Sequence, residues 1–159
     1  EQKLIKTEGD IIHRPATMIV NLGIGSRNIE VSNSYFVPSL ETPRPTYLLC
    51  NMLNLATKKS PQKLRRKQLF TIKSNMSAKP QIALGDFNIR RNSREYAEIL
   101  NTLSLENSSS KQITTMKGLF KKQVDYIFIS KEIEALSCNI LKIKGVSDHH
   151  PLVASIALG

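Results

Sequence analysis

Three short polar blocks each end, enter or precede an apolar run of the sequence. They read Gly85-Asp86-Phe87-Asn88, Val124-Asp125-Tyr126 and Ser147-Asp148-His149. In an extended segment, side chains two positions apart share a face, so Asp86 and Asn88 can act together. A carboxylate beside a carboxamide can orient a water molecule and hold an oxygen of a phosphate.

The other two blocks supply complementary chemistry. An acid paired with a histidine fixes the imidazole tautomer and raises its basicity, which Asp125 could do for His149. A further acid, Asp148, could hold a hard divalent cation through oxygen. Together these parts are what metal-assisted hydrolysis of a phosphoester requires. Each block alone would also suit a turn or a surface loop, because Asp and Asn favour turns. The case rests on all three occurring in order.

The apolar patterning predicts the elements that must position these residues. Strands are predicted over residues 16–22, 28–36, 80–84, 122–129, 139–144 and 151–157. Helices are predicted over 60–76, 93–104 and 131–137. Ser60 and Pro61 favour a helix start, Asn92 with Glu95 forms a candidate capping pair, and Ser130 could cap the helix over 131–137. Helices packed on a mixed sheet or a sheet sandwich fit this pattern, in a single α+β domain over residues 1–159.

The amino-acid composition limits the kinds of molecule that the protein is expected to bind. The 159 residues carry a net charge of +10, which attracts polyanions; nucleic acid is the leading partner and an anionic membrane surface the second. No apolar run approaches the roughly 20 residues of a membrane span. Cys50 and Cys138 lie far apart and outside any metal-binding spacing, which favours a reducing, intracellular compartment.

Basic residues cluster beside two of the polar blocks. Candidate nucleic-acid contacts are Arg90, Arg91, Arg94, Lys117, Lys121 and Lys122. They could hold a phosphate backbone next to the reacting group. Charge runs also commonly mark a solvated face, so sequence alone leaves both interpretations open.

The three blocks, in this order, resemble the last three signatures of the endonuclease/exonuclease/phosphatase superfamily, which includes DNase I and the exonuclease III-like AP endonucleases. The resemblance covers roughly residues 12–159 and implies a DNase I-like sandwich of two sheets flanked by helices, in four α/β/β/α layers. It implies a nuclease that uses Mg²⁺, with Mn²⁺ as a substitute. The substrate it implies is DNA.

Roles follow from the resemblance position by position. His149 would be the general base or the imidazole that polarises the phosphate, and Asp125 would buttress it. Asp86 would orient or deprotonate the attacking water and contact the metal. Asn88 would bind a phosphate oxygen, and Asp148 would contact the metal directly or through water.

Two weaker matches accompany these blocks. Residues 33–38 are similar to the segment in which AP endonucleases carry a catalytic tyrosine, so Tyr35 would hold the phosphate; an ordinary strand aromatic is an equal alternative. Residues 65–69 resemble an Arg-x-x-Gln-Leu helix of the superfamily. For those residues we expect a solvated helix face instead.

The first signatures of the superfamily are not found before Tyr35. They are an Asn on a strand and a later Glu that is the main magnesium ligand. We expect a chain that lacks an N-terminal segment, with a subunit completed by a second chain, or an inactive binding subunit, as alternatives. A phosphatase acting on a phosphoinositide or small phosphate ester is the alternative activity.

Overall fold

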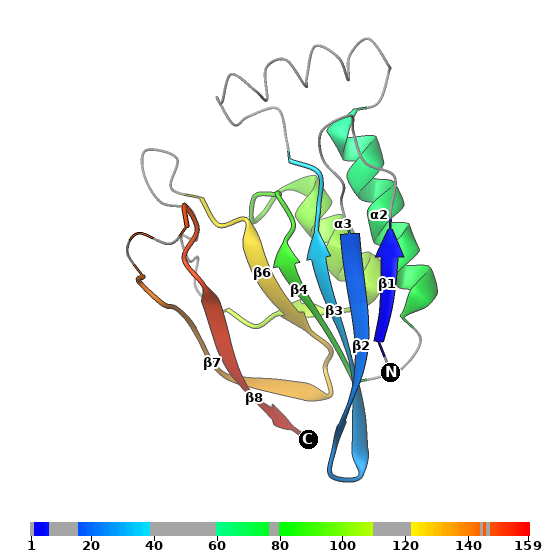
Figure 1. Ribbon diagram of the computed structural model, residues 1–159, viewed down its shortest axis with the longest axis vertical. Helices are drawn as coiled ribbons and strands as arrows, with labels where there is room; N and C mark the ends of the chain where they lie inside the picture. The colour runs from blue at the N-terminus through cyan, green and yellow to red at the C-terminus, as the bar shows by residue number, and fades with distance from the viewer. Residues whose placement is uncertain are drawn as a thin grey trace.

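The computed structural model describes residues 2–6, 16–38, 60–76, 80–109, 122–143, 145 and 147–159 (Figure 1). Six strands form one sheet in the order β1-β2-β3-β4-β6-β5. Their bounds are β1 Gln2–Lys6, β2 Ala16–Ile24, β3 Arg27–Tyr35, β4 Gln81–Asp86, β5 Glu106–Asn107 and β6 Asp125–Ile129. Strands β3 and β4 run parallel, whereas every other neighbouring pair is antiparallel. A second, antiparallel sheet holds β7 (Ile133–Ile140) and β8 (Leu152–Leu158).

Two helices cover one face of the six-stranded sheet, α2 (Pro61–Asn75) and α3 (Arg94–Leu103) (Figure 1). The Ser60 side chain caps α2 by accepting from the Lys63 amide, as the Ser-Pro start predicts. Ser93, and not Asn92, caps α3 by accepting from the Tyr96 amide. The predicted Asn92 cap is wrong because Asn92 takes a left-handed conformation, with φ of 66°, in the turn before the helix. No helix in the described part of the chain is long and apolar enough to span a membrane.

Alternating side chains of the large sheet build two separate cores. The helix-facing core is aromatic, with Phe36, Phe87, Tyr126 and Phe128 all buried against α2 and α3. On the opposite face, a smaller cluster packs the large sheet against β7 and β8. Its buried members are Ile29, Ile82, Ile129 and Ile133. The layers are therefore helices, sheet and sheet, which confirms the two-sheet sandwich. Both described helices lie on one side, so a second helical layer is not among the described residues.

The predicted strands over 16–22, 28–36, 80–84 and 151–157 and the helices over 60–76 and 93–104 are confirmed within a few residues. The strand predicted over 122–129 begins later, at Asp125.

The helix predicted over 131–137 is wrong, because β7 occupies residues 133–140. The Ser130 hydroxyl, expected as its cap, instead accepts from the Gln81 amide at 3.0 Å. Ile133 and Ala135 alternate toward the core between the sheets, a period that fits a strand. Pairing with β8 therefore overrides the local helix signal. The strand predicted over 139–144 is the end of β7, which stops at Ile140.

Candidate active site

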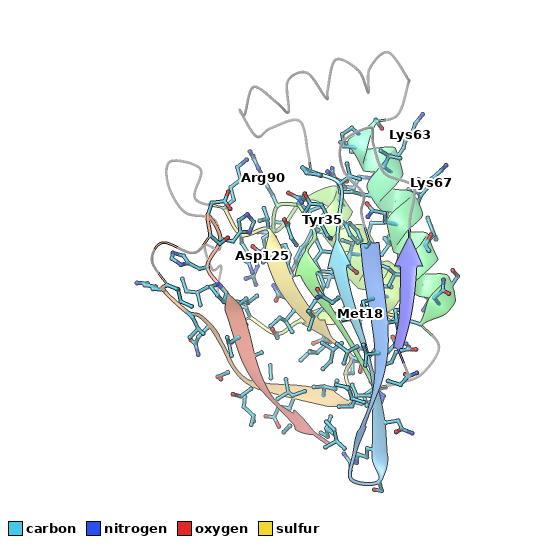
Figure 2. The ribbon with its side chains drawn as sticks, viewed as in Figure 1. Met18, Tyr35, Lys63, Lys67, Arg90 and Asp125 are labelled. Carbon is cyan, nitrogen blue, oxygen red and sulfur yellow. The ribbon has the colours of Figure 1, made fainter. Side chains whose placement is uncertain are left out.

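Tyr35, Asp86 and Asp125 stand in one row across three neighbouring strands. Tyr35 is the register partner of Asp86 between β3 and β4, and Asp86 is the partner of Asp125 between β4 and β6. Register partners put their side chains on the same face of a sheet. The next residues along each strand enter the aromatic core, so the row faces the side of β7 and β8. Figure 2 shows Tyr35 and Asp125 at the same end of the large sheet, here called the site end.

Gly85 allows β4 to reach this position beside β3. Its φ of +131° is one that residues with a side chain rarely adopt. A Cβ atom there would overlap the Ser34 carbonyl oxygen and lie 2.8 Å from the Ser34 nitrogen. The glycine before Asp86 is therefore required by the close approach of two backbones, which sets where the carboxylate emerges.

His149 reaches the row from the second sheet, just before β8. Its Nδ1 atom lies 2.8 Å from Asp125 Oδ2, and both side chains are about three-quarters buried. The His149 amide donates to the Ser147 hydroxyl at 3.0 Å, which fixes the loop. The hydrogen bond to Asp125 is the main cause of a raised His149 pKa; burial opposes it, and the charges of Asp125, Asp86 and Asp148 add to it.

Asp86 is held near its ionisation point at neutral pH. Burial, and then the charge of Asp125, raise its pKa from 3.8 to about 7. The Asn88 amide donates to Asp86 Oδ1 at 2.9 Å and partly opposes this rise, as does the charge of His149. A carboxyl group with this pKa can exchange a proton near pH 7.

Asn88 follows Asp86 in a left-handed conformation, with φ of 50°. Its side-chain Nδ2 donates to the Phe36 carbonyl at 2.9 Å. A carboxamide nitrogen carries two hydrogens, so this bond uses one of them. The structure thus brings Asn88 to the site end beside Asp86.

Three of the predicted site residues could hold a cation together. Asp86, Asp125 and His149 each offer a ligand atom, and these atoms lie within 4.8 Å of one another. The donor set fits a divalent ion, because a cation would relieve the repulsion that raises the pKa of Asp86. The two carboxylates suit Mg²⁺ or Mn²⁺, because both ions prefer oxygen ligands. Asp148 is exposed beside His149 and is not one of these three residues.

A pocket of about 240 Å³ opens next to the His149–Asp125 pair. Its lining residues are Asp125, Ile143, Ser147, His149, His150, Pro151 and Leu152. Its lining includes the ionisable pair together with the apolar residues Ile143, Pro151 and Leu152.

The profile of the Endonuclease/Exonuclease/phosphatase family matches residues 9–149. The chain belongs to this family. The matched range includes all three polar blocks and covers most of the chain. Comparison with curated proteins gives no match.

Solved structures of this family share the fold at low sequence identity. An endonuclease/exonuclease/phosphatase from Bacteroides vulgatus is 14% identical in sequence, with a TM-score of 0.73. The alignment covers 100% of this chain and 65% of the Bacteroides vulgatus protein. TDP2 from D. rerio, solved with a single-strand DNA product, is 14% identical, with a TM-score of 0.67. The alignment covers 99% of this chain and 67% of TDP2. A mannosyl-6-phosphatase from Bacteroides thetaiotaomicron is 13% identical, with a TM-score of 0.65. The alignment covers 99% of this chain and 66% of the phosphatase. The chain thus spans about two-thirds of the length of these relatives.

The basic residues predicted to contact nucleic acid differ in their surroundings. Arg90 and Arg94 are exposed, and Figure 2 shows Arg90 at the site end. Arg91 is half-buried and donates from Nη2 to the Ser109 carbonyl at 3.1 Å, so it anchors a loop. Lys122 is half-buried. Lys117 and Lys121 lie outside the described residues.

The solvated helix face expected over residues 65–69 is wrong at two positions. Arg65 is 4% exposed and Gln68 is 0% exposed; Arg65 donates to the Val37 carbonyl and Gln68 to the Tyr35 carbonyl. Their Arg-x-x-Gln spacing places them on one face of α2. That spacing could have indicated that both side chains are buried. The two basic residues between them instead suggested that the helix face is exposed to solvent.

Proposed function

We propose that this protein is a magnesium-dependent phosphodiesterase that hydrolyses DNA. The observation that carries the proposal is the group of Asp86, Asp125 and His149, in which one acid has a pKa of about 7 and the histidine has a raised pKa. These two shifts supply an acceptor and a donor of protons at neutral pH. Membership of a family of phosphoester hydrolases supports the same reaction class.

His149 would polarise the phosphate. Its Nδ1 atom is committed to Asp125 at 2.8 Å, so the Nε2 atom is the one left to face a substrate. The raised pKa favours the imidazolium, which can donate a hydrogen bond to a phosphate oxygen. Asp125 would act by holding this ring and its charge in place.

Asp86 would accept a proton from the attacking water. The water oxygen forms a new bond to phosphorus as Asp86 takes the proton, the ester P–O bond breaks, and solvent protonates the leaving oxygen. Tyr35 shares the row with Asp86 and would hold the phosphate through its hydroxyl. The second amide hydrogen of Asn88 would bind another phosphate oxygen.

We propose Asp86 and Asp148 as ligands of the magnesium ion, with Asp125 beside them. When bound, the ion would polarise the phosphate as a Lewis acid. Its charge would also lower the pKa of Asp86 and keep the carboxylate ionised.

DNA is the proposed substrate because of charge. The chain carries a net charge of +10, and Arg90 and Arg94 are exposed close in sequence to Asp86 and Asn88. Cations placed around a phosphodiesterase site hold the phosphates that flank the scissile bond.

A plasmid-nicking assay tests the proposal. With Mg²⁺ the protein should convert supercoiled plasmid to the open-circular form, and chelation should stop it. His149→Ala should abolish nicking, whereas Lys73→Gln, an exposed change in the last turn of α2, should not. Absence of nicking by the folded protein, or equal nicking by His149→Ala, contradicts it.

A phosphatase is the second candidate, because the same fold is found in a mannosyl-6-phosphatase. Release of inorganic phosphate from sugar and inositol phosphates would favour it. DNA affinity that does not fall with salt would also weigh against the nuclease, since phosphate contacts release counterions.

A further inference from the structure

We infer that Gln68 and Arg65, on α2, are positioning residues that fix Tyr35 against Asp86. The inference rests on the proposed function for its kinetic consequence, but not for its geometry. Residues 35–37 are the last residue of β3 and the two that follow it, at the site end. Each of their three carbonyl groups accepts a hydrogen bond from a side chain outside β3.

Gln68 pairs with this segment as a neighbouring strand would. Its Nε2 donates to the Tyr35 carbonyl at 3.1 Å, and its Oε1 accepts from the Val37 amide at 3.2 Å. The Gln68 amide thus bonds to the Tyr35 carbonyl and the Val37 N–H, which both point toward the same edge of the strand. Gln68 and Val37 are both 0% exposed, so loss of the bond between them would deprive a buried backbone amide of this acceptor.

Arg65 lies one helical turn before Gln68 and holds the end of the segment. Its Nη1 donates to the Val37 carbonyl at 3.0 Å. Its Nε and Nη2 form a two-point ion pair with Glu95 of α3, at 2.8 and 2.9 Å. A guanidinium that is 4% exposed is costly unless it is paired and bonded in this way. An apolar side chain could fill the same space, but it could not donate to the Val37 carbonyl.

The opposite side of the segment is tied to the acid itself. The Phe36 amide donates to the Asp86 carbonyl at 2.8 Å, and the Phe36 carbonyl accepts from Asn88 at 2.9 Å. Asn88 also holds the Asp86 carboxylate through its amide. The segment that begins at Tyr35 is therefore bonded to α2 on one side and to residues 86–88 on the other. A shift of Tyr35 relative to Asp86 must break the hydrogen bonds on one of these sides.

A double-mutant cycle with Tyr35→Phe tests whether Gln68 acts through Tyr35. Gln68→Met keeps the size of the side chain but removes its donor and acceptor. It should lower kcat on DNA by about 10- to 100-fold, since misplacement by about 1 Å can cost that much, with little change in KM. In the Tyr35→Phe background the same change should lower kcat less than about twofold. A merely structural role would give equal factors in the two backgrounds, which would overturn the inference.

Arg65→Lys provides a second variant should Gln68→Met fail to fold. It retains the charge facing Glu95 but loses the planar fork that reaches Val37. We expect a smaller loss of kcat that again vanishes in the Tyr35→Phe background. Lys73→Gln, on the same helix, is the control and should leave kcat unchanged in both backgrounds.

A spectrum without substrate or metal separates this inference from the proposed function. The chain has four tyrosines, and selective ¹³C labelling would report on each ring. Gln68→Met should move the Tyr35 resonance and leave those of the core residues Tyr96 and Tyr126 in place. A folded variant with an unmoved Tyr35 resonance overturns the positioning role. A wild-type protein that does not cut DNA overturns the proposed function alone.

Discussion

Asp86 and Asp125 are direct register partners on the antiparallel strands β4 and β6. Their carboxylates share one face of the sheet at the site end, and the charge of Asp125 is the second cause, after burial, of the raised Asp86 pKa. Asp125 is also paired with His149 at 2.8 Å. Two acids and a histidine thus meet where repulsion between the acids can be relieved by a proton or by a cation.

The metal-free protein should lose stability as pH rises. Asp86 ionises near 3.8 ordinarily but at about 7 in the fold, and the pKa of His149 is also raised above 6.5. Raised pKa values contribute stability that is present at low pH and lost as pH rises through the folded-state values. The free energy of unfolding should therefore fall from about pH 4 to about pH 7, with the contribution of His149 at the upper end. Asp86→Asn should raise it at the upper end by about 2 kcal/mol. Urea titrations across this range check this; a flat profile, or no gain in Asp86→Asn, would count against it.

The rate of cleavage should be bell-shaped in pH. Asp86 must be ionised to accept a proton, and His149 must be protonated to polarise the phosphate. Raising the Mg²⁺ concentration should move the acidic limb to lower pH, because the cation favours the carboxylate. Asp125→Asn should move the alkaline limb to lower pH, since the hydrogen bond from His149 is the main cause of its raised pKa. If the alkaline limb of kcat against pH stayed at its wild-type position in Asp125→Asn, the assignment of His149 would be wrong.

Gly85→Ala should be severely destabilising. The added Cβ would overlap the Ser34 carbonyl, and φ of +131° is strained for alanine. We expect a loss of at least about 2 kcal/mol in chemical denaturation. Gly25→Ala is the matched control: its φ is +62° but nothing lies within 4 Å of an added Cβ. That variant should lose only about 1 kcal/mol. Equal losses in the two variants would mean that close backbone approach does not set the position of Asp86.

Arg90 should contact the phosphate backbone, whereas Arg91 should not. Arg90→Ala should weaken DNA binding and reduce the dependence of log K on log salt by about 1. Arg91→Ala should leave that slope unchanged and lower stability instead, because Arg91 bonds to the Ser109 carbonyl. Fluorescence anisotropy over a range of salt concentrations measures both effects. A reduced slope in Arg91→Ala alone would reverse the assignment.

The sequence predicted the elements with strong local signals. Ser60-Pro61 marks the start of α2, and the apolar run before Gly85 marks β4. The types of the site residues also followed from the three polar blocks. What local patterns could not supply is register: Tyr35, Asp86 and Asp125 meet only because β3, β4 and β6 pair in one alignment. That alignment depends on contacts between strands that are distant in sequence.

The failures of prediction have a common cause in tertiary structure. Residues 131–137 carry a helix start signal, yet Ser130 bonds to Gln81 and β7 pairs with β8. Arg65 sits in a basic run that suggested solvent, yet Glu95 on α3 neutralises it inside the protein. In both cases a partner far along the chain satisfies a polar group that the local pattern assigned elsewhere.

The rate of Mg²⁺-dependent nicking by Asp86→Asn tests the central claim most directly. The substitution keeps the shape of the side chain but removes the group that would accept the proton and hold the ion. Assayed beside wild type and Lys73→Gln at matched folded concentration, it should lose at least about 100-fold in kcat, with the control unchanged. Nicking by Asp86→Asn at the wild-type rate would contradict the assignment of this row of residues as the site of phosphodiester hydrolysis.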